Sequence, residues 1–561
     1  MRPSRPYFAI FAVKSFAICE EAKHYHAPIT KPVCYPSSVL QIRKQAWLLV
    51  LLSAALQILT FPLPGLYMLS WISVAPLMVA IVHARDPETL QLDASRKWLP
   101  ARPWQGFLLG YACGVLWYLG TCYWVYDTMH QYGGLSAPVG ILVLLLFALY
   151  LGLYHGLFGL LFSLLVRRDS RNRLALLSAP FLWVAIELAR TRISGFPWDL
   201  LGITQVDNIP LTRIATATGV YGLSFEILLV NVAFAATFLV RHSRRRTLLI
   251  TSLAAALLLQ AGRWLTLPPV FADRTAVLLQ QNLSEGGTDP WTDEQIQSAL
   301  HDFSVLSLNL HSATTQHPDL IIWPESPAPF QTNDAAFRQP ISELAHKANA
   351  WLVIGSIGVD NPQTVFNSAS LISPSGEWTA RYSKIHLVPF GEYVPFASVF
   401  SFAGGLTQAV GNFTRGTLHA PLPAGNQKLG IFICYESIFP NEVRQLVADG
   451  ADVLVNISND GWYGDSGAWA QHLNQARMRA IENNRWLLRD TNTGVTASID
   501  PYGRIVARLE RKSRASLAAP YALTKVTTFY SEHGDWFAYL CAIISLGALV
   551  ARFSLQRKTE S

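Results

Sequence analysis

The chain has 561 residues and a formal net charge of +7, with 51% hydrophobic and only 14% charged residues. Because soluble domains carry roughly 25% charged residues, this composition excludes an ordinary soluble protein. The positive charge does not indicate nucleic-acid binding, since arginines between apolar runs account for most of it and no basic face with interleaved aromatic residues is present.

Eight apolar runs predict membrane-spanning helices, because about 20 residues are needed to cross the hydrocarbon core of a bilayer. The first two runs are at the short end of this length, and the fifth contains Glu187. The runs cover residues 46–62, 66–82, 104–126, 138–166, 174–191, 217–240, 247–265 and 535–552. We therefore expect a bundle of seven spans over residues 46–265 and an eighth span within residues 535–561.

Arginine-rich links set the expected orientation of this bundle. Four arginines lie between the fourth and fifth runs, and four more lie between the sixth and seventh. By the positive-inside rule, both links face the cytoplasm. Residues 1–45 are then a cytoplasmic tail, residues 266–534 form an extracytoplasmic domain, and the chain ends in the cytoplasm.

Alternating strand and helix patterns in residues 266–534 predict a layered α/β domain. Short apolar runs predict strands at 275–281, 320–324, 351–357, 366–372, 378–382, 429–434, 452–457 and 486–490, followed by a hairpin around 501–503. Helices are expected at 292–315, 337–349, 437–449 and 468–484. Residues 385–428 are rich in Gly and Pro and predict a long loop, which inside a compact domain is usually functional.

Cys434 is the only one of the six cysteines that falls in residues 266–534, so it cannot form a disulfide within that domain. It ends the predicted strand 429–434, directly before a helical pattern, where a rigid backbone can direct the sulfur out of the sheet edge. A thiol nucleophile also needs a base to take its proton and a cation to steady the oxyanion formed after attack.

Glu325 and Lys384 can fill these two roles, because Glu325 ends a predicted strand and Lys384 stands just before the long loop. Taken singly, each residue also fits an ordinary role. Cys434 fits a buried structural thiol, Glu325 a carboxylate near a helix N-terminus, and Lys384 a solvated lysine. Glu392, inside the loop, fits a surface carboxylate.

The chain carries three motifs that surround these residues: Trp-Pro-Glu325, then Lys384 ahead of His-Leu-Val-Pro-Phe-Gly-Glu392-Tyr-Val-Pro, and Cys434-Tyr-Glu436. Together they resemble the Glu-Lys-Cys motifs of the nitrilase superfamily. With apolar spans on both sides, the resemblance narrows to the apolipoprotein N-acyltransferase family of the bacterial cytoplasmic (inner) membrane. It covers about residues 46–552 and includes two further segments, 195–198 and 456–464.

This resemblance implies a four-layered α-β-β-α sandwich inserted in an eight-helix transmembrane bundle, with the sandwich on the periplasmic side. The implied catalytic residues are Glu325, Lys384 and Cys434. The residues implied to support them are Glu392, Tyr435 and Glu436. In the implied reaction, the thiol takes an acyl chain from a membrane phospholipid and passes it to the N-terminal amine of the diacylglyceryl-cysteine of an apolipoprotein. No cofactor, metal or nucleic acid is implied.

Two lipid substrates also predict a route between the site and the bilayer. We expect the loop 391–428 to form a lid, because it is flanked or occupied by Phe390, Phe396, Phe400, Phe402 and Phe413. Trp198 and Trp291 are expected to bind substrate along this route; the alternative is that they belong to aromatic belts at the membrane interface.

Two other classes of function remain open from the sequence. A membrane-tethered, nitrilase-like amidohydrolase would use the same three residues with water in place of the amine, so the motifs do not exclude it. A transporter or scaffold is less compatible with the chain, because transporters carry paired broken helices and charges near the midplane, whereas these spans carry few charges, chiefly Glu187 and Glu226, and no repeat.

Overall fold

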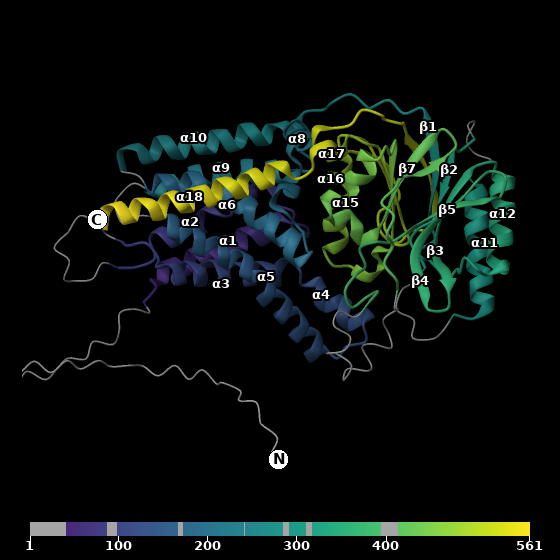
Figure 1. Ribbon diagram of the computed structural model, residues 1–561, viewed down its shortest axis with the longest axis horizontal. Coiled ribbons are helices and arrows are strands. Elements are labelled where there is room, and N and C mark those ends of the chain that lie inside the picture. Colours follow the sequence, from purple (N-terminus) through teal and green to yellow (C-terminus); the bar gives the residue numbers. More distant parts are fainter. Residues whose placement is uncertain are drawn as a thin grey trace, which may run out of the picture. The chain divides into compact units, whose positions relative to one another are not determined.

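Helices dominate the two ends of the chain, and two β-sheets are formed by the residues between them (Figure 1). The computed structural model describes residues 41–86, 98–166, 172–239, 242–283, 291–309, 317–393 and 413–560. Residues 42–561 cluster as one unit. The predicted tail lies almost wholly outside the described residues, as does the centre of the predicted lid, residues 394–412.

Apolar side chains build the helical bundle, in which each predicted span falls on a helix or a pair of helices. The long helices are α1 (Lys44–Thr60), α3 (Pro103–Thr121), α5 (Ala137–Leu165), α6 (Arg173–Ala189), α9 (Val220–Leu239), α10 (His242–Ala261) and α18 (Trp536–Glu560). Shorter helical segments join or extend them: η2 (Tyr67–Trp71), α2 (Ala75–Val82), α4 (Trp124–Asp127), η3 (Thr128–Tyr132), η4 (Arg190–Ser194), η5 (Leu201–Gln205), α7 (Ile209–Thr212), α8 (Ala215–Thr218), η6 (Gly262–Trp264) and α17 (Phe529–His533).

Five of the described helices are long and apolar enough to cross a membrane by length and composition, and a sixth span results if α3 and the segment 124–132 count as one span bent by 52°. The other two predicted spans correspond to shorter apolar helices, 44–60 and 67–82. The chain is thus a multi-pass membrane protein, while the count of eight spans stays a prediction.

Glycines bring α3 and α5 into close contact. A Cβ atom on Gly110 would lie 2.2 Å from the carbonyl oxygen of His155, and one on Gly159 would lie 2.2 Å from that of Gly106. Small residues at four-residue spacing let helix backbones approach in this way inside membranes. Close packing matters there because the hydrophobic effect does not drive one helix against another in lipid.

The domain between the apolar ends contains two mixed six-stranded sheets, with strand orders β12-β1-β2-β3-β4-β5 and β11-β10-β9-β8-β7-β6. The first sheet consists of β1 (Arg274–Gln280), β2 (Leu320–Ile322), β3 (Trp351–Asn361), β4 (Thr364–Ile372), β5 (Trp378–Ser383) and β12 (Ala515–Tyr521). The second consists of β6 (Leu422–Ala424), β7 (Gln427–Ile433), β8 (Val453–Ser458), β9 (Leu487–Thr491), β10 (Ala497–Ile499) and β11 (Ile505–Arg508). In each sheet three central strands are parallel and the outer pairs are antiparallel.

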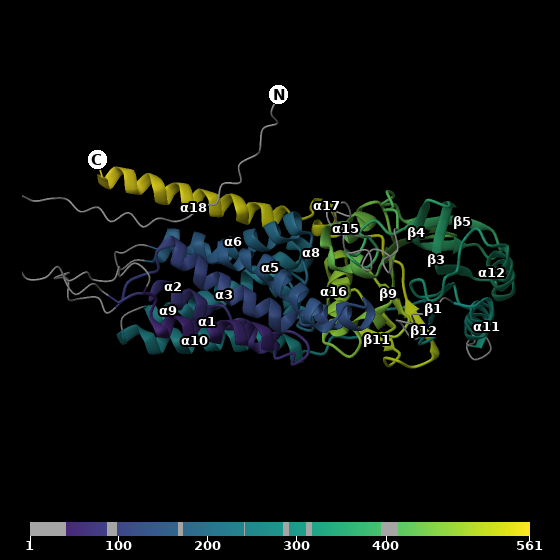
Figure 2. The ribbon, with the colours of Figure 1, turned by 90° about the horizontal axis from the view of Figure 1, so that it is seen from below.

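Apolar side chains from both sheets pack against each other in one core, which includes Leu278 and Ile322 of the first sheet and Ile431 and Val455 of the second. Helices α11 (Asp293–Asn309) and α12 (Ala335–Ala348) pack on the other face of the first sheet. Helices α15 (Pro440–Ala448) and α16 (Ala468–Asn483) pack on the other face of the second. Figure 2 shows α16 beside the helical bundle and α11 and α12 at the opposite end of the domain.

Most predicted strands and helices of this domain are present, but β6 and β12 were not predicted from the sequence. β6 has only three residues and lies inside the predicted long loop. β12 pairs antiparallel with β1 over seven residues, although about 240 residues separate the two in sequence. Its Ala-rich, half-buried sequence is a weak signal for a strand, so the strand depends on this distant pairing.

Candidate active site

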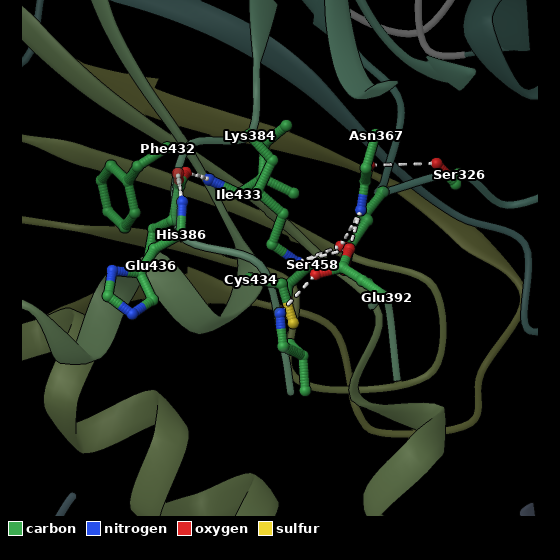
Figure 3. Close-up of polar contacts among 12 residues, drawn as sticks. Ser326, Asn367, Lys384, His386, Glu392, Phe432, Ile433, Cys434, Glu436 and Ser458 are labelled. Atoms are coloured by element: carbon green, nitrogen blue, oxygen red, sulfur yellow. Dashed lines mark hydrogen bonds and ion pairs between the residues drawn. The ribbon is translucent and has the colours of Figure 1, made fainter. Parts of the chain in front are cut away.

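Glu325, Lys384 and Cys434 converge between the ends of strands from both sheets. Glu325 follows β2 and Cys434 follows β7, whereas Lys384 follows β5. The Nζ atom of Lys384 lies 2.9 Å from Oε1 of Glu325, and the three residues are 1–6% exposed. Parallel strands bring side chains to a common edge at their carboxyl ends, and the packed pair of sheets joins two such edges at one site. The three predicted residues therefore form one cluster, in which Figure 3 labels Lys384 and Cys434.

Cys434 begins the 3₁₀ turn η8 (Cys434–Ile438) in a left-handed backbone conformation, with a φ of 47°. Non-glycine residues seldom adopt this conformation, and it is concentrated at functional sites where the surroundings enforce it. Burial and the charge of Glu325 raise the pKa of the Cys434 thiol well above its usual range, and Lys384 and a hydrogen bond from Ser458 offset only part of this rise. The resting side chain is therefore a neutral thiol that needs a base before it can attack.

Lys384 is held between two carboxylates, because its Nζ atom also donates to Oε1 of Glu392 at 3.0 Å. Burial opposes the charged form, but Glu325 and Glu392 outweigh burial and raise the pKa of Lys384 well above its usual value. Glu392 is fixed in turn by the backbone N–H of Val388, which donates to its Oε2 at 2.7 Å. The predicted supporting residue Glu392 thus contacts the predicted cation, and the site contains a fixed ammonium group next to the thiol.

Asn367, on β4, belongs to the site and was missed by sequence reasoning. Its Nδ2 atom donates to Oε1 of Glu325 at 2.7 Å and to Oε1 of Glu392 at 2.6 Å, and its Oδ1 accepts from Ser326 at 3.2 Å. The amide therefore holds two like charges together beside Lys384. Nothing in the local sequence distinguishes this asparagine, since its role depends on β4 lying between β2, which precedes Glu325, and β5, which precedes the segment that contains Glu392.

Glu436 is a buried acceptor that ties the nucleophile turn to the segment after Lys384. Its carboxylate accepts from the backbone N–H groups of Ile433 at 2.6 Å, Ile385 at 2.7 Å and His386 at 3.1 Å, and from the hydroxyl of Tyr382 at 3.0 Å. Burial raises the pKa of Glu436 to about 7, although the N–H groups of Ile433 and His386 favour its ionised form. With its oxygens bound in this way, Glu436 supports the site by positioning backbone.

Tyr435 packs edge-on against Phe439, and its hydroxyl lies 3.4 Å from the carbonyl oxygen of Gly195. Gly195 belongs to the loop between α6 and α9, so the residue after the nucleophile contacts the helical bundle. This contact places the predicted motif at 195–198 next to the site.

The two tryptophans expected to bind substrate lie in different surroundings. Trp198 is fully buried, with Trp124, Tyr463 and His472 around its ring, so it does not line an open route to the site in this structure. Its contact with substrate stays a prediction. Trp291 is 39% exposed just before α11, which covers the outer face of the first sheet, and its contact with substrate stays a prediction.

Among the described residues, no group of three or more His, Cys, Asp or Glu side chains could hold a metal ion. The acid–base and electrostatic groups described above are the carboxylates, the lysine and the thiol. Together they can deprotonate a thiol, stabilise an oxyanion and return a proton to a leaving group.

Comparisons with known proteins cover both parts of the chain. Residues 53–233 match the family described as the apolipoprotein N-acyltransferase N-terminal domain, and residues 279–528 match the carbon-nitrogen hydrolase family. A carbon-nitrogen hydrolase structure from Helicobacter pylori G27 is similar over 44% of this chain and 88% of its own, with 18% identity and a TM-score of 0.34.

Relatives named apolipoprotein N-acyltransferase align over most of the chain. The protein from Geobacter metallireducens is 35% identical over 532 residues, covering 92% of this chain and 97% of the relative. The protein from Pseudomonas aeruginosa is 31% identical over 469 residues, covering 80% and 87%. The two matched domains and these long alignments establish that the chain belongs to the apolipoprotein N-acyltransferase family.

Proposed function

We propose that this acyltransferase transfers an acyl chain from a membrane phospholipid, through a thioester on Cys434, to the N-terminal amine of the diacylglyceryl-cysteine of apolipoproteins. Family membership makes the chain an enzyme of lipoprotein N-acylation that acts on phospholipid and lipoprotein in a membrane. The observation that carries the chemical proposal is the buried Cys434, with its left-handed backbone, beside the Lys384–Glu325 pair.

In the first half-reaction, Glu325 takes the thiol proton while Sγ of Cys434 attacks the ester carbonyl carbon of the phospholipid. The carbonyl oxygen becomes an oxyanion, and the ammonium group of Lys384 stabilises it, a contribution often worth about 3 kcal/mol per donor. When the carbon–oxygen ester bond breaks, Glu325 returns the proton to the glyceryl oxygen. The products are a lysophospholipid and an acyl thioester on Cys434.

In the second half-reaction, the free α-amine of the apolipoprotein attacks the thioester carbon. Glu325 accepts a proton from the attacking nitrogen, and Lys384 again stabilises the oxyanion. The carbon–sulfur bond breaks and the sulfur regains its proton from Glu325. An amide is formed, lipoprotein maturation is complete, and the enzyme returns to its starting state.

Glu392 and Asn367 support this chemistry by fixing the base and the cation. Both contact the Glu325–Lys384 pair directly, so Lys384 keeps its charge and Glu325 keeps its orientation. A preorganised cation stabilises the transition state without the cost of reorganising its surroundings during the reaction.

The architecture that we infer is a four-layered α-β-β-α sandwich, residues 266–534, inserted before the last of eight spans. The separate packing of α11 and α12 on one sheet and of α15 and α16 on the other supports the layering. The arginine-rich links support a cytoplasmic tail over residues 1–45, a seven-span bundle over residues 46–265 and a cytoplasmic end after residues 535–552. The catalytic domain then faces the periplasm from the inner membrane.

A membrane-tethered amidohydrolase would use the same cluster with water as the second nucleophile. The family match across the helical region disfavours it, since a soluble domain would suffice for a soluble amide. Lipid substrates explain the bundle, because extracting an acyl chain into water costs about 0.8 kcal/mol per CH₂ group.

The decisive experiment is intact-mass analysis of the purified protein after exposure to phospholipid alone. We expect an acyl adduct on the wild-type protein and on the matched control Cys541→Ala, and none on Cys434→Ala. The adduct should discharge when a diacylglyceryl peptide with a free amine is added and should persist with an N-blocked peptide. Steady-state kinetics should then follow a ping-pong pattern with parallel lines.

Two outcomes would contradict the proposal. Discharge of the adduct by water at the same rate with either peptide would favour the amidohydrolase. Intersecting kinetic lines without a trappable adduct would mean direct transfer in a ternary complex.

A further inference from the structure

His472, on α16, contacts the backbone of Cys434, the proposed nucleophile. Its Nε2 atom lies 3.0 Å from the carbonyl oxygen of Cys434, and its Nδ1 atom lies 2.9 Å from Oδ1 of Asp460. The His472 side chain has no exposed surface, and Asp460 is 1% exposed. The reaction derived above uses neither residue, yet both stand next to the left-handed backbone of Cys434.

The partners of His472 determine where its hydrogens lie. The Cys434 carbonyl can only accept, so Nε2 must carry a hydrogen, whereas Nδ1 can either donate to Asp460 or accept from Arg489. Nη2 of Arg489 donates to both oxygens of Asp460, at 3.0 and 2.8 Å, and also lies within hydrogen-bond distance of Nδ1, at 3.1 Å. Burial opposes the ionised form of Asp460, but Arg489 and His472 outweigh burial and hold the pKa of Asp460 well below its usual range. Nε2 is therefore a donor to the Cys434 carbonyl.

The bundle holds the other side of this imidazole. The indole of Trp198 stacks on the His472 ring at 5.8 Å between centroids and 11° between planes. The adjacent Gln471 accepts from Nε1 of Trp198 at 2.7 Å and donates to the carbonyl oxygens of Pro62 at 2.8 Å and Thr121 at 3.2 Å. Two consecutive residues of α16 thus join the nucleophile turn to three separate segments of the helical bundle.

We propose that His472 is a positioning residue that fixes the Cys434 carbonyl, and that Trp198 and Gln471 make this position depend on the docked helical bundle. A residue with a φ of 47° keeps that conformation only if its peptide groups are held from outside. Glu436 accepts from the backbone N–H of Ile433, directly before the turn, and His472 holds the carbonyl of Cys434. The thiol is then aimed at the Glu325–Lys384 pair only while the bundle supports the ring.

This inference rests on the proposed thioester at Cys434. It adds the requirement that the Cys434 carbonyl be held in place, which Glu325, Lys384 and Cys434 alone do not impose. Three substitutions of His472 separate the functions of its ring. His472→Gln keeps a donor near the Nε2 position, His472→Asn can reach only Asp460, and His472→Phe keeps a ring for Trp198 without any donor. The exposed His346→Gln, on α12, is the matched control.

The measurement is the single-turnover rate of thioester formation over a range of phospholipid concentrations. We expect His472→Gln to stay within about tenfold of wild type, and His472→Asn and His472→Phe to lose roughly 100-fold, the loss typical of a buried hydrogen bond. The loss should fall on the maximal rate and leave the half-saturating lipid concentration unchanged, because His472 does not contact the lipid. His346→Gln should react like wild type.

A wild-type rate for His472→Phe, or equal losses of rate for His472→Gln and His472→Phe, would overturn the positioning role and leave only packing. If His472→Phe does not fold, Gln471→Met decides the coupling to the bundle, because it removes three hydrogen bonds while leaving His472 in place. We expect a loss of about tenfold in its maximal rate, and an unchanged rate would overturn the coupling. Absence of any thioester on the wild-type protein would instead contradict the proposed function, so the two failures are distinguishable.

Discussion

At the scale of single residues, the site combines a neutral thiol with a permanently charged ammonium. Burial and Glu325 raise the pKa of Cys434, while the flanking carboxylates keep Lys384 protonated. In the proposed reaction, the thiol therefore stays neutral until Glu325 takes its proton. This differs from thiol enzymes in which a lowered pKa maintains a thiolate at rest.

The raised pKa of Cys434 predicts how iodoacetamide alkylation depends on pH. Because the pKa lies above its usual range, the thiolate fraction is small at neutral pH and grows about tenfold per pH unit up to that pKa. We expect the alkylation rate, followed by intact mass, to rise continuously between pH 7 and 9.

Glu325→Gln provides the control for this experiment. It removes the negative charge that raises the pKa, so alkylation at a given pH should become faster while acyl transfer is lost. A plateau below pH 8 in the wild-type protein would instead show a thiolate already formed at rest.

At the scale of elements, the site depends on how closely β3 passes under the turn after β2. A Cβ atom on Gly355 would lie 1.9 Å from the carbonyl oxygen of Pro324 and 2.8 Å from the backbone nitrogen of Ser326. Both neighbours are backbone atoms on either side of Glu325. The glycine on β3 therefore sets the position of Glu325, the proposed base.

Gly355→Ala is expected to displace the Pro324–Ser326 backbone and lower the rate of thioester formation by roughly 100-fold or more, since misplacement of about 1 Å can cost that much. Gly358→Ala, on the same strand, is the matched control because its Cβ would meet only side-chain atoms of Ser368 and Arg381, which can move. Both rates and both melting temperatures should be measured. Equal rates in the two variants would show that β3 does not set the position of Glu325.

At the scale of the whole molecule, the sandwich and the bundle meet through specific polar contacts as well as apolar packing. Arg213 of the loop before α8 donates to the carbonyl oxygen of Pro501, and its Nη2 donates to Oδ1 of Asn484 at 3.0 Å. The chain enters the sandwich after α10 and leaves it before α18, so both connections join the same bundle.

The inferred orientation predicts the behaviour of reporter fusions. A reporter that is active only outside the cytoplasm should be active when fused after residue 270 and inactive when fused after Arg173 or Arg246. The physical reason is that the arginine-rich links stay on the cytoplasmic side. The reverse pattern would place Glu325, Lys384 and Cys434 in the cytoplasm and contradict the proposed periplasmic reaction.

The sequence by itself determined the classes of element and predicted the chemistry. Hydrophobic runs and alternation are local signals, and they predicted the positions of the apolar helices and of most strands. Glu325, Lys384 and Cys434 were found because each stands at a strand end or beside a loop within a long motif. The same motifs identified the family.

Only the tertiary structure decided which side chains meet. The pairing of β12 with β1, the bridge from Asn367 to two carboxylates and the contact of His472 with the Cys434 carbonyl join residues far apart in sequence. It also decided that Trp198 is buried against His472. Such contacts depend on strand order and on the docking of one layer against another, and a local residue pattern contains no information about either.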